Sequence, residues 1–419
     1  MKTEFLGYEL RGQIIAASCP ATESSIGITA CYANGAAAVI LKTASSTRLD
    51  QGEAEGGRHC LINKQGFWAK STFNREIMPL NEGLELLKNT PRWSSFGFMP
   101  LISSVTELEL DIEKWLVDCR AVEDAGADAI QLDLFYIENL LAVPGFEEKF
   151  IKLLKEIRNH AKVPVMPKLN IGLPAEYAAF LLKKAGIKYV SLLDSIKSPA
   201  PLSFSPEGQP AVNKMFLGSG LSVFGSFMLP ITRNYTQVLC REGFEVCAGG
   251  GVKTAEDIAG LLFLGAKTVQ MATEILLHGF ERIKTLADET SVLLTKAGIT
   301  DEESIKTTGQ NLYNPLPESA KCRAKWNIEK CMLRKHPEDC FHCAYNNGHP
   351  KGQAFCPRIN YGGSKTIAIH ESCEGCGLCA QLCSHGAIEM VRIDCMRRVH
   401  TQDPACAGEP LGRYKGYVP

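Results

Sequence analysis

The placement of cysteine says most about the chemistry of this chain. The sequence has 419 residues and 17 cysteines, eleven of which lie between Cys322 and Cys406. Four of them have the spacing C-x2-C-x2-C-x3-C, which holds a [4Fe–4S] cluster in bacterial ferredoxins. One tight loop supplies three thiolates and the next turn supplies the fourth. The predicted cluster ligands are Cys373, Cys376, Cys379 and Cys383.

A second set of cysteines precedes this motif. Two residues separate Cys340 from Cys343, and Cys356 is followed by proline, as in a ferredoxin motif that carries an insertion. Cys331 would complete the set, and Cys322 is the alternative. These residues predict a second [4Fe–4S] cluster, in which Cys356 and Cys383 would exchange partners as in two-cluster ferredoxins. A structural zinc ion or free thiols are the alternatives.

Glycines and cations elsewhere in the chain indicate an anion site. Residues 248–252 read Ala-Gly-Gly-Gly-Val, and Ala272-Thr273 stands at the predicted start of a helix. Glycine backbone and helix N-termini present free amides, which bind phosphate. The alternative is that the glycines form a flexible turn. Lys42-Thr43 stands at the end of one apolar run and Lys168 near the end of another, and both lysines would direct positive charge toward the mouth of the barrel.

The elements that position these residues follow one repeating pattern. Amphipathic stretches end at glycine and lead into short, uniformly apolar runs, which indicate helices followed by buried parallel strands. Eight such strands, with helices between them, predict a (β/α)8 TIM barrel, whose active site lies at the carboxyl ends of the strands. An open doubly wound sheet is the alternative, but no Gly-x-Gly-x-x-Gly follows the first strand. The predicted strands are residues 13–17, 37–41, 99–103, 129–132, 163–169, 189–193, 245–248 and 268–271.

Composition and charge restrict the class of protein further. The chain has 45 Lys+Arg, 46 Asp+Glu and a net charge of −1, so nothing draws it to nucleic acid or to an anionic membrane. No apolar run reaches the ~18 residues of a membrane span, and the first residues lack a signal-peptide layout. We therefore expect a cytoplasmic protein, in which the cysteines bind metal rather than form disulfides. The turn-rich residues 313–319 predict a barrel over 1–312 and a ferredoxin-like, cysteine-rich domain over 313–419.

Six segments carry a resemblance to a known family. The chain resembles the dihydroorotate dehydrogenase family of FMN-binding barrels, and most of all the bacterial dihydropyrimidine dehydrogenase subunits, which join such a barrel to an iron–sulfur module. The segments are residues 15–20 (Ile-Ala-Ala-Ser-Cys-Pro), 39–43 (Val-Ile-Leu-Lys-Thr), 167–170 (Pro-Lys-Leu-Asn), 218–222 (Gly-Ser-Gly-Leu-Ser), 247–257 and 269–273 (Val-Gln-Met-Ala-Thr).

The resemblance implies FMN and a set of residues that hold it. Gly250, Gly251, Ala272 and Thr273 would bind its phosphate, and Lys168 would lie beside the polar edge of the isoalloxazine. The full implied set is Ala17, Ser18, Lys42, Thr43, Lys168, Asn170, Gly220, Ser222, Gly249, Gly250, Gly251, Ala272 and Thr273.

The substrate side departs from the family pattern. Asp133 stands where the family has Asn, Tyr136 stands where it has the acid/base Cys, and Asp194-Ser195 replaces Asn-Thr. An ionised Asp only accepts hydrogen bonds, so we expect a substrate that presents N–H or cationic groups. Tyr136 is the candidate proton donor, with Asp133 or Asp194 as alternatives, unless Tyr136 only packs the loop. The predicted catalytic residues are Asn74, Asp133, Tyr136, Asp194 and Ser195.

Together these features predict an oxidoreductase that acts on a CH–CH (ene) or C=N bond of a small, nitrogen-containing substrate and relays electrons between [4Fe–4S] and FMN. The chain has no dinucleotide-binding fingerprint, so the resemblance implies an electron-donor partner, either an NAD(P)H-oxidising flavoprotein subunit or a ferredoxin, in a homodimer or hetero-oligomer. The alternatives are a dihydropyrimidine dehydrogenase subunit that reduces uracil or thymine, a non-catalytic electron-transfer flavoprotein, and a phosphate-binding lyase or isomerase.

Overall fold

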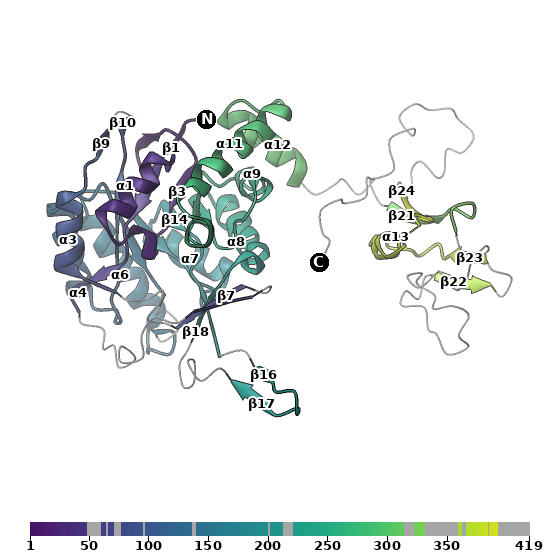
Figure 1. Cartoon of the computed structure of the whole chain (residues 1–419), viewed down its shortest axis with the longest axis horizontal. Helices are drawn as coiled ribbons and strands as arrows, with labels where there is room; N and C mark the ends of the chain where they lie inside the picture. The colour runs from purple at the N-terminus through teal and green to yellow at the C-terminus, as the bar shows by residue number, and fades with distance from the viewer. Residues whose placement is uncertain are drawn as a thin grey trace. The chain divides into compact units, whose positions relative to one another are not determined.

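The chain divides into two compact units, Met1–Tyr313 and Asn314–Pro419 (Figure 1). A computed structural model describes residues 1–47, 60–63, 66–70, 77–94, 97–135, 140–199, 202–212, 221–313, 322–331, 359–362, 366–383 and 385–392.

The first unit is a closed barrel of eight parallel strands, which confirms the predicted fold. The strands follow the order β12-β13-β14-β19-β20-β3-β4-β11, and a pairing between β11 and β12 closes the ring. Each of the eight strands coincides with a predicted apolar run. Their bounds are β3 (Ile14–Ala16), β4 (Ala38–Ile40), β11 (Leu101–Val105), β12 (Ala129–Asp133), β13 (Val165–Lys168), β14 (Tyr189–Ser191), β19 (Glu245–Gly249) and β20 (Thr268–Met271).

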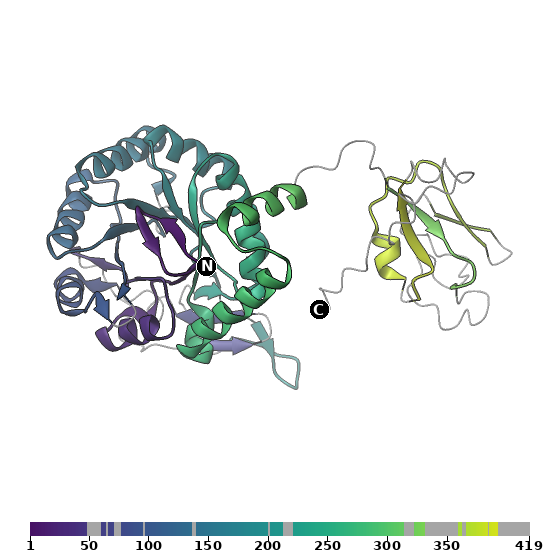
Figure 2. The same cartoon turned by 90° about the horizontal axis from the view of Figure 1, so that it is seen from above.

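Helices surround the barrel (Figure 2), and their buried apolar residues pack into its core. In α4 (Ile112–Asp124), the side chain of Asp111 caps the first turn by accepting hydrogen bonds from the amides of Glu113 and Lys114. Trp115, which is 2% exposed, lies on the buried face of this helix. The other helices are α1 (Ser25–Ala33), α3 (Leu80–Asn89), α6 (Phe146–His160), α7 (Ala175–Ala185), α8 (Leu229–Arg241), α9 (Ala255–Phe263), α10 (Thr273–His278), α11 (Glu281–Lys296) and α12 (Glu302–Tyr313).

An N-terminal hairpin closes one end of the barrel. It consists of β1 (Thr3–Phe5) and β2 (Tyr8–Leu10), and its side chains Phe5 and Leu10 pack against the amino-terminal halves of the strands. The hydroxyl of Tyr8 donates to the carbonyl of Asp128, directly before β12. The hairpin therefore fills the amino-terminal end of the barrel.

Short antiparallel strands interrupt the loops at the carboxyl end. The strands β15 (Ile196–Ser198), β18 (Leu221–Phe224), β7 (Gly66–Lys70) and β6 (Cys60–Asn63) form a four-stranded sheet. The strands β6 and β7 follow β5 (Ala44–Ser45), whereas β15 and β18 follow β14. The pairing of β7 with β18 therefore joins two segments that are far apart in the sequence. Small elements complete this unit: β8 (Met78–Pro79), which pairs with β5, and the hairpins β9 (Trp93–Ser94) with β10 (Gly97–Phe98) and β16 (Leu202–Phe204) with β17 (Pro210–Val212).

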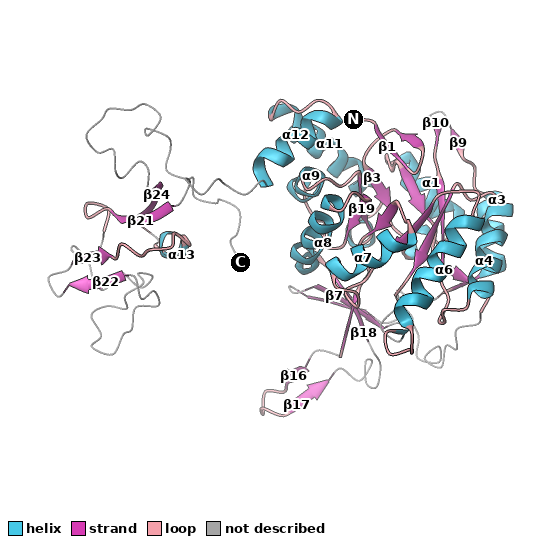
Figure 3. Cartoon of the chain, turned by 180° about the vertical axis from the view of Figure 1, so that it is seen from behind, coloured by secondary structure: helices cyan, strands magenta, loops and turns pink. Residues whose placement is uncertain are grey.

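The second unit is small and mainly β-structured in its described part (Figure 3). The strand β21 (Cys322–Trp326) pairs antiparallel with β24 (Ile388–Arg392), and β22 (Ile359–Gly362) pairs with β23 (Thr366–Ile369). The short helix α13 (Leu378–Leu382) begins inside the predicted cluster motif. The buried apolar core of this unit consists of Ala324, Cys331, Cys379, Ala387 and Ile388.

Candidate active site

A cavity of about 880 Å³, including its solvent-filled opening, lies at the carboxyl ends of the barrel strands. Most of the residues predicted from the sequence lie in its wall, although they come from loops spread over more than half of the chain. They are Ala17, Ser18, Lys42, Thr43, Asp133, Lys168, Asp194, Ser195, Gly250, Gly251, Ala272 and Thr273.

Three predicted cofactor residues are buried beside the cavity rather than in its wall. Asn170 donates its side-chain amide to the carbonyl of Phe135 (2.7 Å) and accepts from the amide of Gly172 (2.7 Å), so it ties two loops together. Ser222 is 1% exposed within the antiparallel sheet. A Cβ at Gly249 would lie 2.4 Å from the side chain of Gln270, which accounts for a glycine there. Asn74, Tyr136 and Gly220 lie outside the described residues.

The glycine loop after β19 is held by its neighbours. Gly250 and Gly251 have positive φ angles of 102° and 92°, and a Cβ at Gly251 would lie 2.5 Å from the amide nitrogen of Leu229 at the start of α8. The hydroxyl of Thr232 donates to the carbonyl of Gly250 (2.7 Å). The tight packing requires glycine here and fixes the loop, which argues against a flexible turn.

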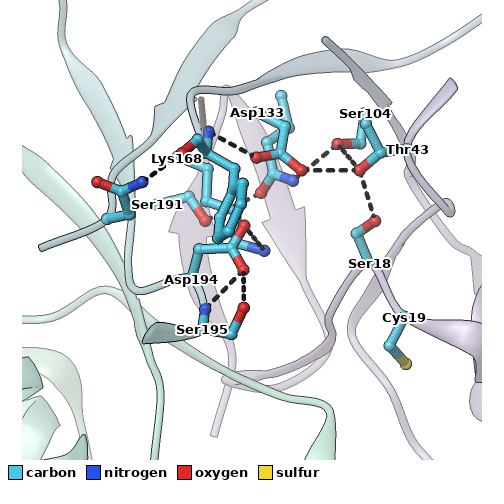
Figure 4. Close-up of polar contacts among 12 residues, drawn as sticks. Ser18, Cys19, Thr43, Ser104, Asp133, Lys168, Ser191, Asp194 and Ser195 are labelled. Carbon is cyan, nitrogen blue, oxygen red and sulfur yellow. Dashed lines mark hydrogen bonds and ion pairs between the residues drawn. The ribbon is translucent and has the colours of Figure 1, made fainter. Parts of the chain in front are cut away.

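Thr43 is the centre of a polar network on one side of the cavity (Figure 4). Its hydroxyl donates to Oδ2 of Asp133 (3.0 Å) and lies 3.1 Å from the hydroxyl of Ser18. The amide of Phe135 donates to the other carboxylate oxygen of Asp133 (3.1 Å). Protein donors therefore already satisfy part of the acceptor capacity of Asp133, and its orientation is fixed before any ligand binds.

Lys168 and Asp194 form a buried ion pair in the cavity wall (Figure 4). Their Nζ and Oδ2 atoms are 3.3 Å apart, and their side chains are 9% and 8% exposed. The second carboxylate oxygen of Asp194 accepts from the amide (2.6 Å) and the hydroxyl (3.2 Å) of Ser195. We expected Lys168 to bring positive charge to the mouth of the barrel, but the structure places a compensating carboxylate directly beside it.

Gln270 is a wall residue that the sequence analysis did not single out. Its side-chain amide donates to the hydroxyl of Ser191 and to the carbonyl of Leu192, both at 2.6 Å. Its side-chain oxygen is buried and has no hydrogen-bond partner among the described residues. A buried acceptor without a donor costs about 1–3 kcal/mol, so a ligand N–H or O–H at this position would be favourable. The available signal was a polar residue inside the otherwise apolar run of β20.

The wall as a whole fits FMN by its chemistry. A loop of two glycines offers backbone to a phosphate group, Lys42 adds a buried cation, and the unpaired oxygen of Gln270 suits a ring N–H. Apolar side chains such as Met228 and Val252 line the same cavity and suit a flat aromatic system.

A buried carboxyl pair anchors the chain where it leaves β5. Glu107 accepts hydrogen bonds from the hydroxyls of Ser45 (3.0 Å) and Thr47 (2.7 Å), and Asp118 accepts from the amide of Ser46 (2.9 Å). Burial, with a contribution from Glu107, raises the pKa of Asp118 to about 6. The pair lies outside the cavity wall, so we assign it a structural role.

The predicted cluster cysteines are only partly gathered. Cys331, Cys373, Cys379 and Cys383 all contribute to the small core of the second unit, whereas Cys376 is exposed. The amide of Ala387 donates to the sulfur of Cys383 (3.2 Å). In the part of the chain that the structure describes, no group of three or more His, Cys, Asp or Glu side chains is arranged to hold a metal ion. Cys340, Cys343 and Cys356 lie outside that part.

The closed parallel barrel, with its cavity at the carboxyl ends of the strands, defines a (β/α)8 barrel protein. Within the described residues, every helix is too short or too polar to cross a bilayer.

Comparison with known proteins narrows this class. The chain is a distant homologue of the NAD-dependent dihydropyrimidine dehydrogenase subunit PreA of Escherichia coli, with 26% identity over 286 residues, which are 65% of this chain and 67% of that protein. Its barrel has the TIM-barrel fold of the dihydroorotate dehydrogenase-like proteins.

Two further relatives match shorter stretches. The isopentenyl-diphosphate delta-isomerase of Archaeoglobus fulgidus is 30% identical over 173 residues (41% of this chain, 48% of that protein). The chloroplastic dihydropyrimidine dehydrogenase (NADP(+)) of Arabidopsis thaliana is 29% identical over 210 residues (45% and 47%). No protein-family model matches the chain.

Proposed function

We propose that this chain is an FMN- and iron–sulfur-dependent oxidoreductase that acts on a CH–CH or C=N bond of a small, nitrogen-containing substrate. One observation carries the proposal: nine of the thirteen residues that the resemblance assigned to FMN line one cavity at the carboxyl end of the barrel. FMN would supply hydride transfer to or from the substrate carbon. The homology to dihydropyrimidine dehydrogenases supports the same class of reaction.

The chain's own residues would bind and orient this cofactor. We assign the phosphate to the backbone of Gly250, Gly251, Ala272 and Thr273. Gln270 would accept a hydrogen bond from the ring system, because its oxygen is buried in the wall without a partner among the described residues. Asn170 would act indirectly, by joining the loops that follow β12 and β13.

The C-terminal unit would hold at least one [4Fe–4S] cluster. The four cysteines of the motif 373–383 have the donor type and spacing that such a cluster requires. Cys331 lies in the same small core as three of these cysteines. We propose it as the fourth ligand of a second cluster, together with Cys340, Cys343 and Cys356. A cluster supplies one-electron exchange, so we infer an electron-donor partner, either an NAD(P)H-oxidising flavoprotein subunit or a ferredoxin. The E. coli relative is named as an NAD-dependent subunit, which supports the first choice.

The substrate pocket favours a ligand with N–H groups. Asp133 and Asp194 both lie in the cavity wall, and an ionised carboxylate only accepts hydrogen bonds, which supports a ligand that donates them. Tyr136 stays our candidate for the proton donor. The second candidate function is reduction of a pyrimidine such as uracil or thymine, because two relatives are named dihydropyrimidine dehydrogenases.

Anaerobic purification with flavin, iron and sulfide measured on the same sample tests the proposal. We expect one FMN per chain and about four iron atoms per cluster. Adding uracil or thymine to the reduced protein then separates the two substrate candidates, since only a pyrimidine reductase is reoxidised. A protein that contains no flavin and binds none when FMN is added would refute the oxidoreductase assignment.

A further inference from the structure

The ion pair in the cavity wall joins two neighbouring strands of the barrel. Lys168 ends β13, Asp194 follows β14 by three residues, and these strands pair in parallel. Only 3.3 Å separates the two charged atoms, and both side chains are more than nine-tenths buried. The two contacts from Ser195 orient the carboxylate toward the lysine. The pair is therefore built into the wall.

Asp194 changes the charge balance of the cavity. The ionisable side chains among the described wall residues are Lys42, Lys168, Asp133 and Asp194, so their formal charges cancel. An asparagine at 194 would remove one of the two negative charges and leave the wall positive by one formal charge. The net charge of the cavity wall therefore changes when this carboxylate is replaced.

We propose that Asp194 is a positioning residue that holds Lys168 in place and cancels its charge, and that it thereby lowers the midpoint potential of the bound flavin. This inference rests on the proposed FMN site. Reduction makes FMN more negative, so a positive wall favours the reduced form and a neutral wall does not. At an effective dielectric of about 20, one unit charge about 7 Å away changes an equilibrium by tenfold or more.

The test compares midpoint potentials of the holoprotein by spectroelectrochemical titration. We expect Asp194→Asn to raise the midpoint potential. The affinity for reduced FMN should increase at least tenfold relative to the affinity for oxidised FMN, and for a two-electron couple a tenfold change corresponds to about 30 mV. Glu274→Gln is the matched control. Glu274 is also a buried carboxylate in an ion pair, with Arg282 at 2.8 Å, but it is absent from the cavity wall. We expect the flavin midpoint potential of the Glu274→Gln protein to equal that of the wild type.

A second background tests the role of Lys168. A buried carboxylate that loses its cationic partner takes up a proton, so Asp194 should be neutral in the Lys168→Met protein. Adding Asp194→Asn to that protein should therefore shift the midpoint potential much less than it does in the wild type. An equal shift in both backgrounds would overturn the pairing, and no shift for Asp194→Asn alone would overturn the proposal. Absence of FMN from the wild-type protein would instead contradict the proposed function, so the two failures are distinguishable.

Discussion

Replacing Gly251 by alanine tests the assigned phosphate loop most directly. Gly251 has a φ of 92°, where an alanine costs about 1–2 kcal/mol. Its Cβ would also lie 2.5 Å from the amide nitrogen of Leu229, well inside contact distance. The loop or the start of α8 must move, which adds roughly 1–3 kcal/mol. A displaced loop can no longer present both amides to one phosphate, so we expect FMN affinity to fall at least tenfold.

Gly35→Ala provides a control with the same backbone penalty. Gly35 has a φ of 95°, and a Cβ there would meet nothing within 4 Å. This glycine lies between α1 and β4, outside the cavity wall. Both variants should lower the melting temperature, Gly251→Ala by more, and only Gly251→Ala should raise the dissociation constant of FMN, measured by fluorescence quenching. A folded Gly251→Ala protein that binds FMN with wild-type affinity would refute the phosphate assignment.

Three further predictions concern other parts of the molecule. Because burial raises the pKa of Asp118 to about 6, the folded state binds more protons than the unfolded state from about pH 4 to 6. The free energy of unfolding should therefore fall as pH rises through this window, and Asp118→Asn should flatten the urea-measured profile whereas the exposed Glu113→Gln on the same helix should not. Cys379→Ser should lower the iron and sulfide content by about one cluster and leave the FMN content unchanged. Cys240→Ser, in the barrel, is its control, and equal iron content in the wild type and both variants would exclude Cys379 as a cluster ligand. Tyr136→Phe should abolish turnover and leave flavin reduction by the electron donor intact, so unchanged turnover would exclude Tyr136 as the acid.

The sequence alone determined the architecture of the barrel and most of the cavity wall. Glycine-ended helices and short apolar runs are local signals, and each depends on residues that are neighbours in the chain. Eight such units can close in essentially one way, so the strand ends that carry Lys42, Lys168 and the glycine loop had to meet at one rim. The cysteine spacing gave the predicted cluster ligands in the same local manner, and those ligands stay a prediction.

Only the tertiary structure decided how side chains from different strands combine. Whether Lys168 is paired depends on its distance to Asp194, which follows the next strand, and no periodicity within either segment encodes that distance. For the same reason the sequence did not predict Gln270 as a wall residue. Asn170 joins the loops that follow β12 and β13, and Ser222 lies in β18, which pairs with β15 and β7. Local spacing fixes which residues reach the rim of a barrel, but closure of the sheet fixes which of them face the ligand and which face one another.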